Sequence, residues 1–224
     1  MSQAQSLGIV IDTDQQVSGL LLAPREARAC YVFAHGAGAG MTHAFMAAMA
    51  SGLASRGIAT LRYQFPYMER GSRRPDVPRV AQAAVRAAVA EAARRLPAMP
   101  LFAGGKSFGG RMTSQAQAAG LLPGVRGLVF VGFPLHPAGK PGDERGAHLF
   151  EVSVPMLFLQ GTRDDLADLD LLQPLVERLG ARAELRLFAH ADHSFHVPAR
   201  VGRDAEVMAA MLDAFAAWIA AQGA

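Results

Sequence analysis

The sequence predicts an α/β fold, in which a mainly parallel central sheet is covered by helices on both faces. Short, continuous apolar runs recur along the chain, as is typical of strands that are buried on both faces. Between them lie segments whose apolar residues recur every three or four positions, as on one face of a helix. With 224 residues, 51% of them hydrophobic, the chain is long enough to bury a full core as one domain, residues 1–224.

The elements follow from these patterns in chain order. An antiparallel hairpin of strands 7–11 and 17–22, joined through residues 12–14, is expected first. The remaining runs predict buried strands at residues 29–34, 58–63, 99–104, 127–131, 155–160 and 183–188. One-sided apolar stripes predict core-facing helices at residues 77–96 and 207–219, and a further helix covers 109–119. Asp165 and Asp168 suit the first turn of a helix that follows the strand at 155–160.

The pentapeptide Gly105-Lys106-Ser107-Phe108-Gly109 lies between a predicted strand and a predicted helix. Strand, G-x-S-x-G and helix in this order indicate a nucleophile elbow, a sharp turn that exposes a serine hydroxyl. Side chains flanking so tight a turn would collide with neighbouring backbone, which explains the two glycines. Ser107 is therefore the candidate nucleophile, at a helix N-terminus whose free N–H groups favour developing negative charge.

After such a nucleophile, an acid and then a histidine are expected along the chain, each following a later strand. Asp164 lies just beyond the next strong apolar run and is preferred over Asp165, because it is closer to the strand end, where loop N–H groups can fix a carboxylate. His193 lies deepest in the loop after the last predicted strand and is the candidate base. His196, in the same loop, is the alternative.

An oxyanion hole is expected in the glycine-rich turn 35–43, which follows the first parallel strand. Its glycines let the backbone approach a ligand closely, so that an N–H can point at a bound carbonyl oxygen. Ala37 is the preferred donor and Gly38 the next, acting with the N–H of Phe108. The spacing is not G-x-G-x-x-G and no P-loop lysine follows, which disfavours a phosphate-binding loop. His35 is expected to shape this turn by hydrogen bonding.

These motifs resemble those of the α/β-hydrolases over nearly the whole chain. More closely, the chain resembles the small bacterial hydrolases grouped with the testis-expressed and NSL-complex-subunit hydrolase-like domains, near the dienelactone-hydrolase-like branch. The segments that carry this closer resemblance are His35-Gly36-Ala37-Gly38 with Met41, residues 62–69, Gly104-Gly105-Lys106-Ser107 with Gly109-Gly110-Arg111, Leu135-His136-Pro137, residues 161–164 and residues 191–195. The resemblance implies an α/β-hydrolase fold with a Ser107-Asp164-His193 triad. Dienelactone hydrolases proper have a cysteine nucleophile, so their particular chemistry is not implied.

The composition indicates which classes of binding partner to expect. The 22 Lys and Arg against 19 Asp and Glu give a net charge of +3, and the basic residues are scattered arginines without an interleaved aromatic platform. We therefore expect no nucleic-acid partner. No apolar segment follows a basic start and no apolar run is long enough for a bilayer, so we expect a cytoplasmic protein without a membrane partner. The single cysteine, Cys30, lies inside a predicted strand, and neither a metal nor an organic cofactor is expected.

The rim of the expected site is basic. The segment 133–154, which follows the strand after the elbow, is short and rich in proline and glycine. It has room for a loop and a single turn of helix, so no large lid is expected. The candidate substrate-binding side chains near the strand ends are Arg62, Lys106, Arg111 and His136. If they converge, the substrate carries a carboxylate or phosphate. The competing interpretation makes the arginines structural, through ion pairs with Glu69 or Asp76.

Together these features predict a serine hydrolase that cleaves a small-molecule ester or thioester through an acyl-enzyme. His193 takes the proton of Ser107, while Asp164 fixes the imidazole tautomer and stabilises its charged form. One alternative is an interaction module that keeps the elbow without turnover, which the intact triad disfavours. The other is a peptidase or acyltransferase with the same triad, because pocket shape decides the acyl acceptor. The oligomeric state does not follow from the sequence.

Overall fold

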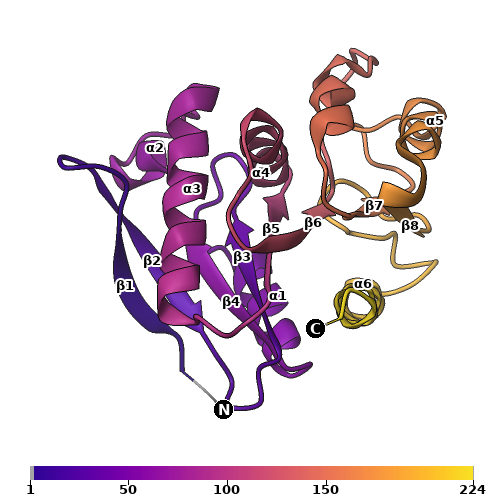
Figure 1. The fold of residues 1–224 in the computed structure, drawn as a ribbon. Helices are drawn as coiled ribbons and strands as arrows, with labels where there is room; N and C mark the ends of the chain where they lie inside the picture. Colours follow the sequence, from indigo (N-terminus) through magenta and orange to yellow (C-terminus); the bar gives the residue numbers. More distant parts are fainter. Residues whose placement is uncertain (1–2, 224) are drawn as a thin grey trace.

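The computed structural model describes residues 3–223 (Figure 1). Its strands are β1 (Gln5–Val10), β2 (Gln16–Leu22), β3 (Ala29–Ala34), β4 (Ile58–Tyr63), β5 (Leu101–Lys106), β6 (Val125–Val131), β7 (Met156–Gly161) and β8 (Ala183–Phe188). They form one sheet in the order β1-β2-β4-β3-β5-β6-β7-β8. The hairpin β1–β2 is antiparallel, β2 runs antiparallel to β4, and every other neighbouring pair is parallel. The predicted, mainly parallel sheet is confirmed.

Helices cover both faces of this sheet, as predicted (Figure 1). They are α1 (Ala44–Ala54), α2 (Pro66–Glu69), α3 (Pro78–Arg95), α4 (Phe108–Ala119), α5 (Leu169–Leu179) and α6 (Asp204–Ala221), with the 3₁₀ helices η1 (Glu144–Glu151) and η2 (Gly180–Arg182). One apolar layer holds the inner faces of α3, α4 and α5, and the other holds those of α1 and α6. All parallel strands therefore end at one edge of the sheet, and that edge carries the loops described below.

Two elements differ from the sequence prediction. Strand β5 starts two residues later than predicted and continues through Lys106, so it ends directly at Ser107. Helix α1 was not predicted at all. Its segment is rich in alanine and methionine and has no charged face, so the contrast that reveals an amphipathic helix is weak, although Met46, Met49 and Leu53 are buried along one side. Asp168 begins α5 as its N-cap, accepting a hydrogen bond from the N–H of Asp170, while Asp165 stays outside the helix.

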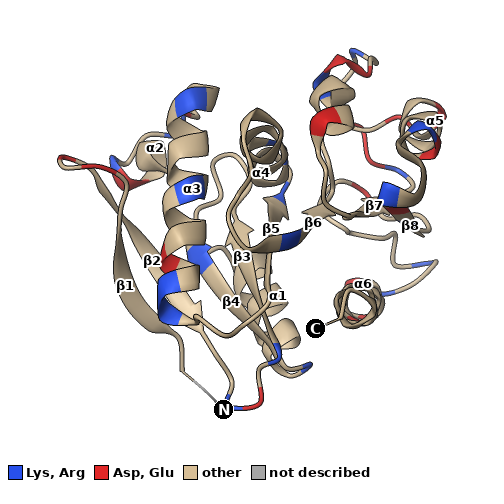
Figure 2. Cartoon of the chain, in the orientation of Figure 1, with Lys and Arg blue, Asp and Glu red and all other residues tan. Residues whose placement is uncertain are grey.

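The largest helix of the first layer, α3, begins with Pro78 at a position where its missing N–H costs nothing. Its buried side is mostly alanine, which lets the helix approach the sheet closely. Its outer side carries several arginines (Figure 2), so the basic residues are less scattered than the sequence suggested. Three of these arginines are engaged locally: Arg94 and Arg95 both contact Glu91, and Arg86 donates to carbonyls at the end of α4.

No lid domain interrupts the described chain between β6 and β7. The segment there folds into a loop and η1, which is longer than the single helical turn expected. Leu149 of η1 is fully buried and anchors this segment to the core. Within residues 3–223, none of the helices has the length and apolar character needed to cross a membrane.

Candidate active site

Ser107 stands between β5 and α4 in a sharp turn. Its backbone has φ 50° and ψ −117°, a strained conformation for a residue with a side chain. Two backbone hydrogen bonds hold it: its N–H donates to Val131 O on the neighbouring strand, and its C=O accepts from the N–H of Arg111 in α4. The predicted strand–turn–helix context of the pentapeptide is therefore present in the structure.

The flanking glycines are required by close backbone contacts. A Cβ on Gly105 would lie 2.5 Å from Ala34 O, and one on Gly109 would lie 2.6 Å from the carbonyl oxygens of Ala34 and His35. The end of strand β3 and the start of α4 thus lie so close together that no side chain fits between them.

We expect Gly105→Ala to lower the free energy of unfolding by about 2 kcal/mol or more, because the rigid backbone around the elbow has to move apart. Urea unfolding followed by circular dichroism measures this. Gly202→Ala is the matched control, since its Cβ would meet nothing closer than 3.7 Å and should change stability by less than about 0.5 kcal/mol. Equal unfolding midpoints for the two variants would contradict the packing argument.

Three side chains from separate loops meet at this turn. His193, in the loop after β8, lies with Nε2 2.8 Å from Ser107 Oγ and Nδ1 2.7 Å from Asp164 Oδ2. Asp164 follows β7 and is 5% exposed. Its carboxylate also accepts from Gln160 Nε2 at 2.6 Å and from the N–H of Leu166 at 2.8 Å. A buried carboxylate with three donors holds the imidazole in one orientation, with Nδ1 protonated and Nε2 facing the serine.

The two alternatives lie elsewhere. Asp165 is exposed and borders a surface hollow with Asp192 and His196 of the histidine loop, the segment between β8 and α6, whereas His193 Nδ1 pairs with Asp164. His196 is also exposed and pairs with Asp204, its Nδ1 lying 2.6 Å from Asp204 Oδ2. The choice within each pair follows from which side chain the backbone turns inward, and local sequence does not encode that direction.

Lys106 connects the elbow to the histidine loop. Its ammonium donates to the backbone oxygen of His193 at 2.7 Å and lies 5.7 Å from the ring centroid of Phe195. Burial lowers the pKa of Lys106 to about 8, against the opposing effect of Asp164 and Asp192. The sequence prediction made Lys106 a substrate-binding residue; the structure places it in the pocket lining, with its ammonium hydrogen-bonded to the backbone oxygen of His193.

The turn after β3 supplies a candidate oxyanion hole. The N–H of Gly38 donates to the hydroxyl of Tyr67 at 2.9 Å, so it is occupied. Within residues 3–223, neither the Ala37 N–H nor the Phe108 N–H donates a hydrogen bond to protein. Ala37 borders the same pocket as Ser107, and Phe108 begins α4. Of the two donors considered in this turn, Ala37 therefore has the free N–H.

His35 is fully buried beneath this turn and does not reach Ser107. Its Nε2 accepts from the N–H of Phe65 at 3.1 Å, so the proton lies on Nδ1, which donates to Gly36 O at 2.7 Å. Burial lowers the pKa of His35 to about 4. The neutral ring thus connects the β3 turn to the segment after β4, as expected for a residue that shapes the loop.

This burial predicts a loss of stability in acid. The folded-state pKa of His35 lies below the ordinary value of about 6.5, so between those pH values the unfolded chain binds a proton that the folded chain does not. The contribution is full above pH 6.5 and falls by up to about 3 kcal/mol as the pH drops to about 4. Urea unfolding at pH 7 and pH 4.5 should show a smaller acid loss in His35→Asn than in wild type. The exposed control His190→Asn should lose as much as wild type; an unchanged loss in His35→Asn would refute the assignment.

The other predicted basic residues do not converge on Ser107. Arg62 is 6% exposed and donates to Met41 O at 3.1 Å, which ties β4 to the β3 turn. Arg111 lies against the ring of Phe108, and neither guanidinium lines the pocket at Ser107. His136 uses both ring nitrogens on backbone, with Nδ1 donating to Pro137 O and Nε2 accepting from the N–H of Asp168.

The expected ion pairs of these arginines are also wrong. Glu69 accepts from the N–H and hydroxyl of Ser18, and Asp76 pairs with Arg70. Backbone carbonyls and aromatic faces, which sequence does not reveal, take the place of the expected carboxylates. Among the described residues, no three His, Cys, Asp or Glu side chains are arranged to hold a metal ion.

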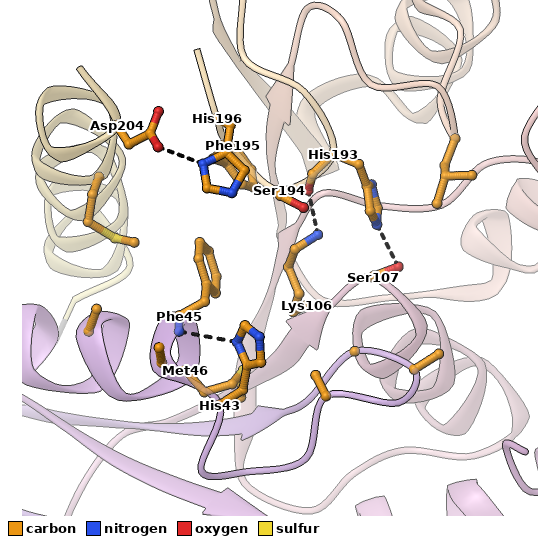
Figure 3. Close-up of a pocket in the computed structure, with 17 residues that line it drawn as sticks. His43, Phe45, Met46, Lys106, Ser107, His193, Ser194, Phe195, His196 and Asp204 are labelled. Carbon is orange, nitrogen blue, oxygen red and sulfur yellow. Dashed lines mark hydrogen bonds and ion pairs between the residues drawn. The ribbon is translucent and has the colours of Figure 1, made fainter. Parts of the chain in front are cut away.

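A pocket of about 730 Å³ opens beside Ser107. It extends from Ser107 and His193 past Phe45 and Phe195 towards Asp204 (Figure 3). This volume is within the range of small-molecule sites. Its walls come from the β3 turn, α1, the histidine loop and the start of α6.

Sequence reasoning missed the residues of the far wall. Phe45 lies in the unpredicted helix α1. Met208 was assigned to a core-facing stripe, yet it lines the pocket together with Phe45. The available signal was that Met208 lies at the start of the α6 stripe, shortly after the histidine loop, but only the packing of α6 against α1 brings it into the pocket that contains Ser107.

Comparison with known proteins agrees with this architecture. A dienelactone hydrolase from Anabaena variabilis has a TM-score of 0.77 at 20% identity, with 97% of this chain and 96% of that chain covered. An alpha-beta serine hydrolase homologue from Coxiella burnetii has a TM-score of 0.76 at 19% identity, with 95% and 97% covered. A serine hydrolase without a lid from Xanthomonas campestris has a TM-score of 0.74 at 19% identity, with 97% and 96% covered. At these identities the likeness is one of fold.

The sequence itself matches a family model over residues 27–220, from just before β3 to the end of α6. That model is the alpha/beta hydrolase domain, and the matched range contains the elbow, the loop after β7 and the histidine loop. The chain therefore belongs to the alpha/beta hydrolase family.

Proposed function

We propose that the protein is a serine hydrolase that cleaves a small carboxylic ester or thioester through an acyl-enzyme. The observation that carries the proposal is the continuous hydrogen-bonded series from Ser107 Oγ through the imidazole of His193 to the carboxylate of Asp164. It lies at the wall of a pocket large enough for a small molecule, with two free backbone N–H groups nearby. This is the set of parts that acyl transfer needs: nucleophile, base, orienting acid and oxyanion donors.

Acylation begins when Ser107 Oγ attacks the carbonyl carbon and His193 Nε2 accepts the hydroxyl proton. The carbonyl electron pair moves to oxygen, and the N–H groups of Ala37 and Phe108 stabilise the oxyanion. Asp164 stabilises the imidazolium that forms. When the oxyanion collapses, the bond to the leaving oxygen or sulfur breaks, and that atom takes the proton from His193.

Deacylation repeats these steps with water. His193 takes a proton from a water molecule that attacks the acyl carbon, and the bond between carbonyl carbon and Ser107 Oγ breaks with return of the proton to Oγ. The products are a carboxylic acid and the regenerated serine. The protein groups described above supply every proton transfer in this scheme.

The finer relationship proposed for this chain rests on its motifs. The elbow sequence, the β3 turn and the segment around Asp164 resemble the testis-expressed and NSL-complex-subunit hydrolase-like domains, near the dienelactone-hydrolase-like branch. The relationship supports a serine nucleophile on a small hydrolase core. The relationship does not indicate the substrate, which depends on the shape and chemistry of the pocket.

Labelling with a fluorophosphonate probe tests this function. Ser107 Oγ should displace fluoride from phosphorus in wild type, Ser107→Ala should remain unlabelled, and His193→Ala should label at least about 100-fold more slowly. A panel of 4-nitrophenyl esters, acyl thioesters and peptide anilides then identifies the acyl bond that is cleaved. Folded wild-type protein that stays unlabelled would contradict the proposal and favour an interaction module, whereas turnover of anilides alone would favour a peptidase.

A further inference from the structure

The walls of the Ser107 pocket are mainly apolar. Most of the side chains that line it are small aliphatic, thioether or aromatic groups: Ala37, Ala39, Ala44, Phe45, Met46, Ala48, Leu166, Phe195 and Met208. They come from five separate segments: the β3 turn, α1, the loop after β7, the histidine loop and α6. Figure 3 shows Phe45 between His43 and His196. The pocket therefore offers mainly dispersion contacts. Besides Lys106, Ser107 and His193, its polar side chains are the exposed ones of His43, Ser194, His196 and Asp204.

The charged side chains of this lining are engaged by protein groups. Lys106 donates to His193 O, and the carboxylates of Asp164 and Asp192 act on its charge over a longer distance. Asp204 accepts from His196 Nδ1 at 2.6 Å and from the N–H of Val197 at 2.9 Å. No arginine is among the lining residues. A carboxylate or phosphate on the substrate would lose water here without gaining an unengaged cation, which is unfavourable.

The aromatic side chain of Phe195 is held in place within the histidine loop, the same loop that carries His193. Phe195 is 3% exposed and has φ 64°, a left-handed conformation that is rare for a bulky residue. Asp192 stabilises this turn: its C=O accepts from the N–H of Phe195, and its Oδ1 accepts from the N–H groups of Ser194 and His196. One turn thus positions both the base, His193, and the aromatic ring two residues later.

The ring of Phe195 in turn defines the wall opposite α1. Its centroid lies 6.1 Å from that of Phe45, with the two planes inclined by 17°, and 5.9 Å from that of Phe188 in an edge-on arrangement. Strained backbone at a functional site persists where the surroundings impose it. The strain here places an aromatic surface in the wall of the pocket that contains Ser107.

We propose that this pocket selects substrates whose larger group, beside the scissile bond, is uncharged and apolar. Phe45, Phe195 and Met208 are the specificity-determining residues. The inference rests on the proposed hydrolase function and replaces the anionic substrate that the basic residues of the sequence suggested. It follows from which side chains reach the cavity and which of them have unengaged charge.

The test compares two fluorophosphonate probes of equal length, one with an arm ending in an isopropyl group and the other in an isosteric carboxylate. Wild type should react with the isopropyl probe at least tenfold faster. The matched ester pairs are 4-nitrophenyl 4-methylpentanoate against 4-nitrophenyl hemisuccinate, which vary the acyl group, and 3-methylbutyl acetate against the acetate ester of 3-hydroxypropanoate, which vary the alcohol. In the pair whose variable group enters the pocket, the neutral ester should have the higher kcat/KM by a similar factor.

Met208→Arg adds a cation to the wall and should reduce the preference for the neutral probe at least fivefold. Ala209→Arg is the matched control, because it adds the same charge one position along α6, on an exposed residue outside the pocket lining. It should keep the wild-type ratio.

The outcomes separate the two proposals. If wild type reacts equally fast with both probes, or faster with the carboxylate, the apolar selectivity is overturned while the serine hydrolase function stands. If both probes label Ser107 and Met208→Arg leaves the ratio unchanged, Met208 does not determine specificity and the proposed wall is wrong. If neither probe labels folded wild-type protein, the proposed function fails first, and the inference fails with it.

Discussion

Ser107→Ala is expected to lower kcat for the best ester substrate by about 10⁶-fold, because the remaining groups bind the ester without a nucleophile. The hydroxyl of Ser107 makes one side-chain hydrogen bond, to His193, so its removal should leave the fold intact. Steady-state kinetics at pH 8 measures the loss, and circular dichroism confirms that the variant is folded. A variant that retains more than a thousandth of wild-type turnover would exclude Ser107 as the nucleophile.

The chain contains its own control for this experiment. Ser114, two turns later in α4, has Oγ 2.7 Å from Nε2 of His148, as close as the Ser107–His193 contact. Burial and Arg111 lower the pKa of His148 to about 4, so this imidazole is a poor acceptor for a serine proton at neutral pH. Ser114 is also fully buried within the helix. Ser114→Ala should therefore keep kcat/KM within about threefold of wild type.

Asp164→Asn should lower kcat by about 10⁴-fold through the wrong histidine tautomer. Oδ1 accepts from the N–H of Leu166, and an asparagine that keeps this bond turns its amide nitrogen towards His193 Nδ1 and also towards Gln160 Nε2, whose bond to the carboxylate is lost. The imidazole then carries its proton on Nε2, towards Ser107, and has no lone pair to accept the hydroxyl proton. The same kinetic assay measures this effect, with KM little changed because Asp164 lies behind the histidine and outside the pocket lining at Ser107.

Asp165→Asn is the matched control, one residue along the same loop. It removes the same charge from an exposed side chain that does not contact His193, so activity should stay within about twofold of wild type. If the two substitutions reduce kcat equally, the effect reports local charge and the assignment of Asp164 is wrong.

Much of the fold could be predicted from local pattern. Strands such as β3 and β7 are continuous apolar runs because both of their faces are buried, and this burial leaves a direct record in the sequence. Ser107 was identifiable because the glycines at 105 and 109 are required by backbone contacts within the elbow itself. Helix α1 was not, since it lies beside α6 on one face of the sheet and its exposed positions, Ala44, Ala48 and Ser51, are too weakly polar to show a period.

The neighbours of Arg62 and His136 could not be predicted. Both were expected near the substrate, yet they bond to backbone atoms of Met41, Pro137 and Asp168. Backbone carbonyls and N–H groups are present at every position, so sequence gives no indication of which of them a buried side chain will meet. For this reason the sequence left open whether these basic side chains bind an anionic substrate or have a structural role.

The sequence by itself predicted the class of fold, the strand–turn–helix around Ser107, and the candidate acid and histidine after later strands, because each prediction rests on a short local pattern. Tertiary structure alone decided that Asp164 and His193 face Ser107, that Ala37 keeps a free N–H, and that Phe45 and Met208 complete the pocket. The physical reason is that these contacts are made between segments that lie far apart in the sequence. Their distances depend on how α1, α6 and the sheet pack together, and no local pattern specifies that packing.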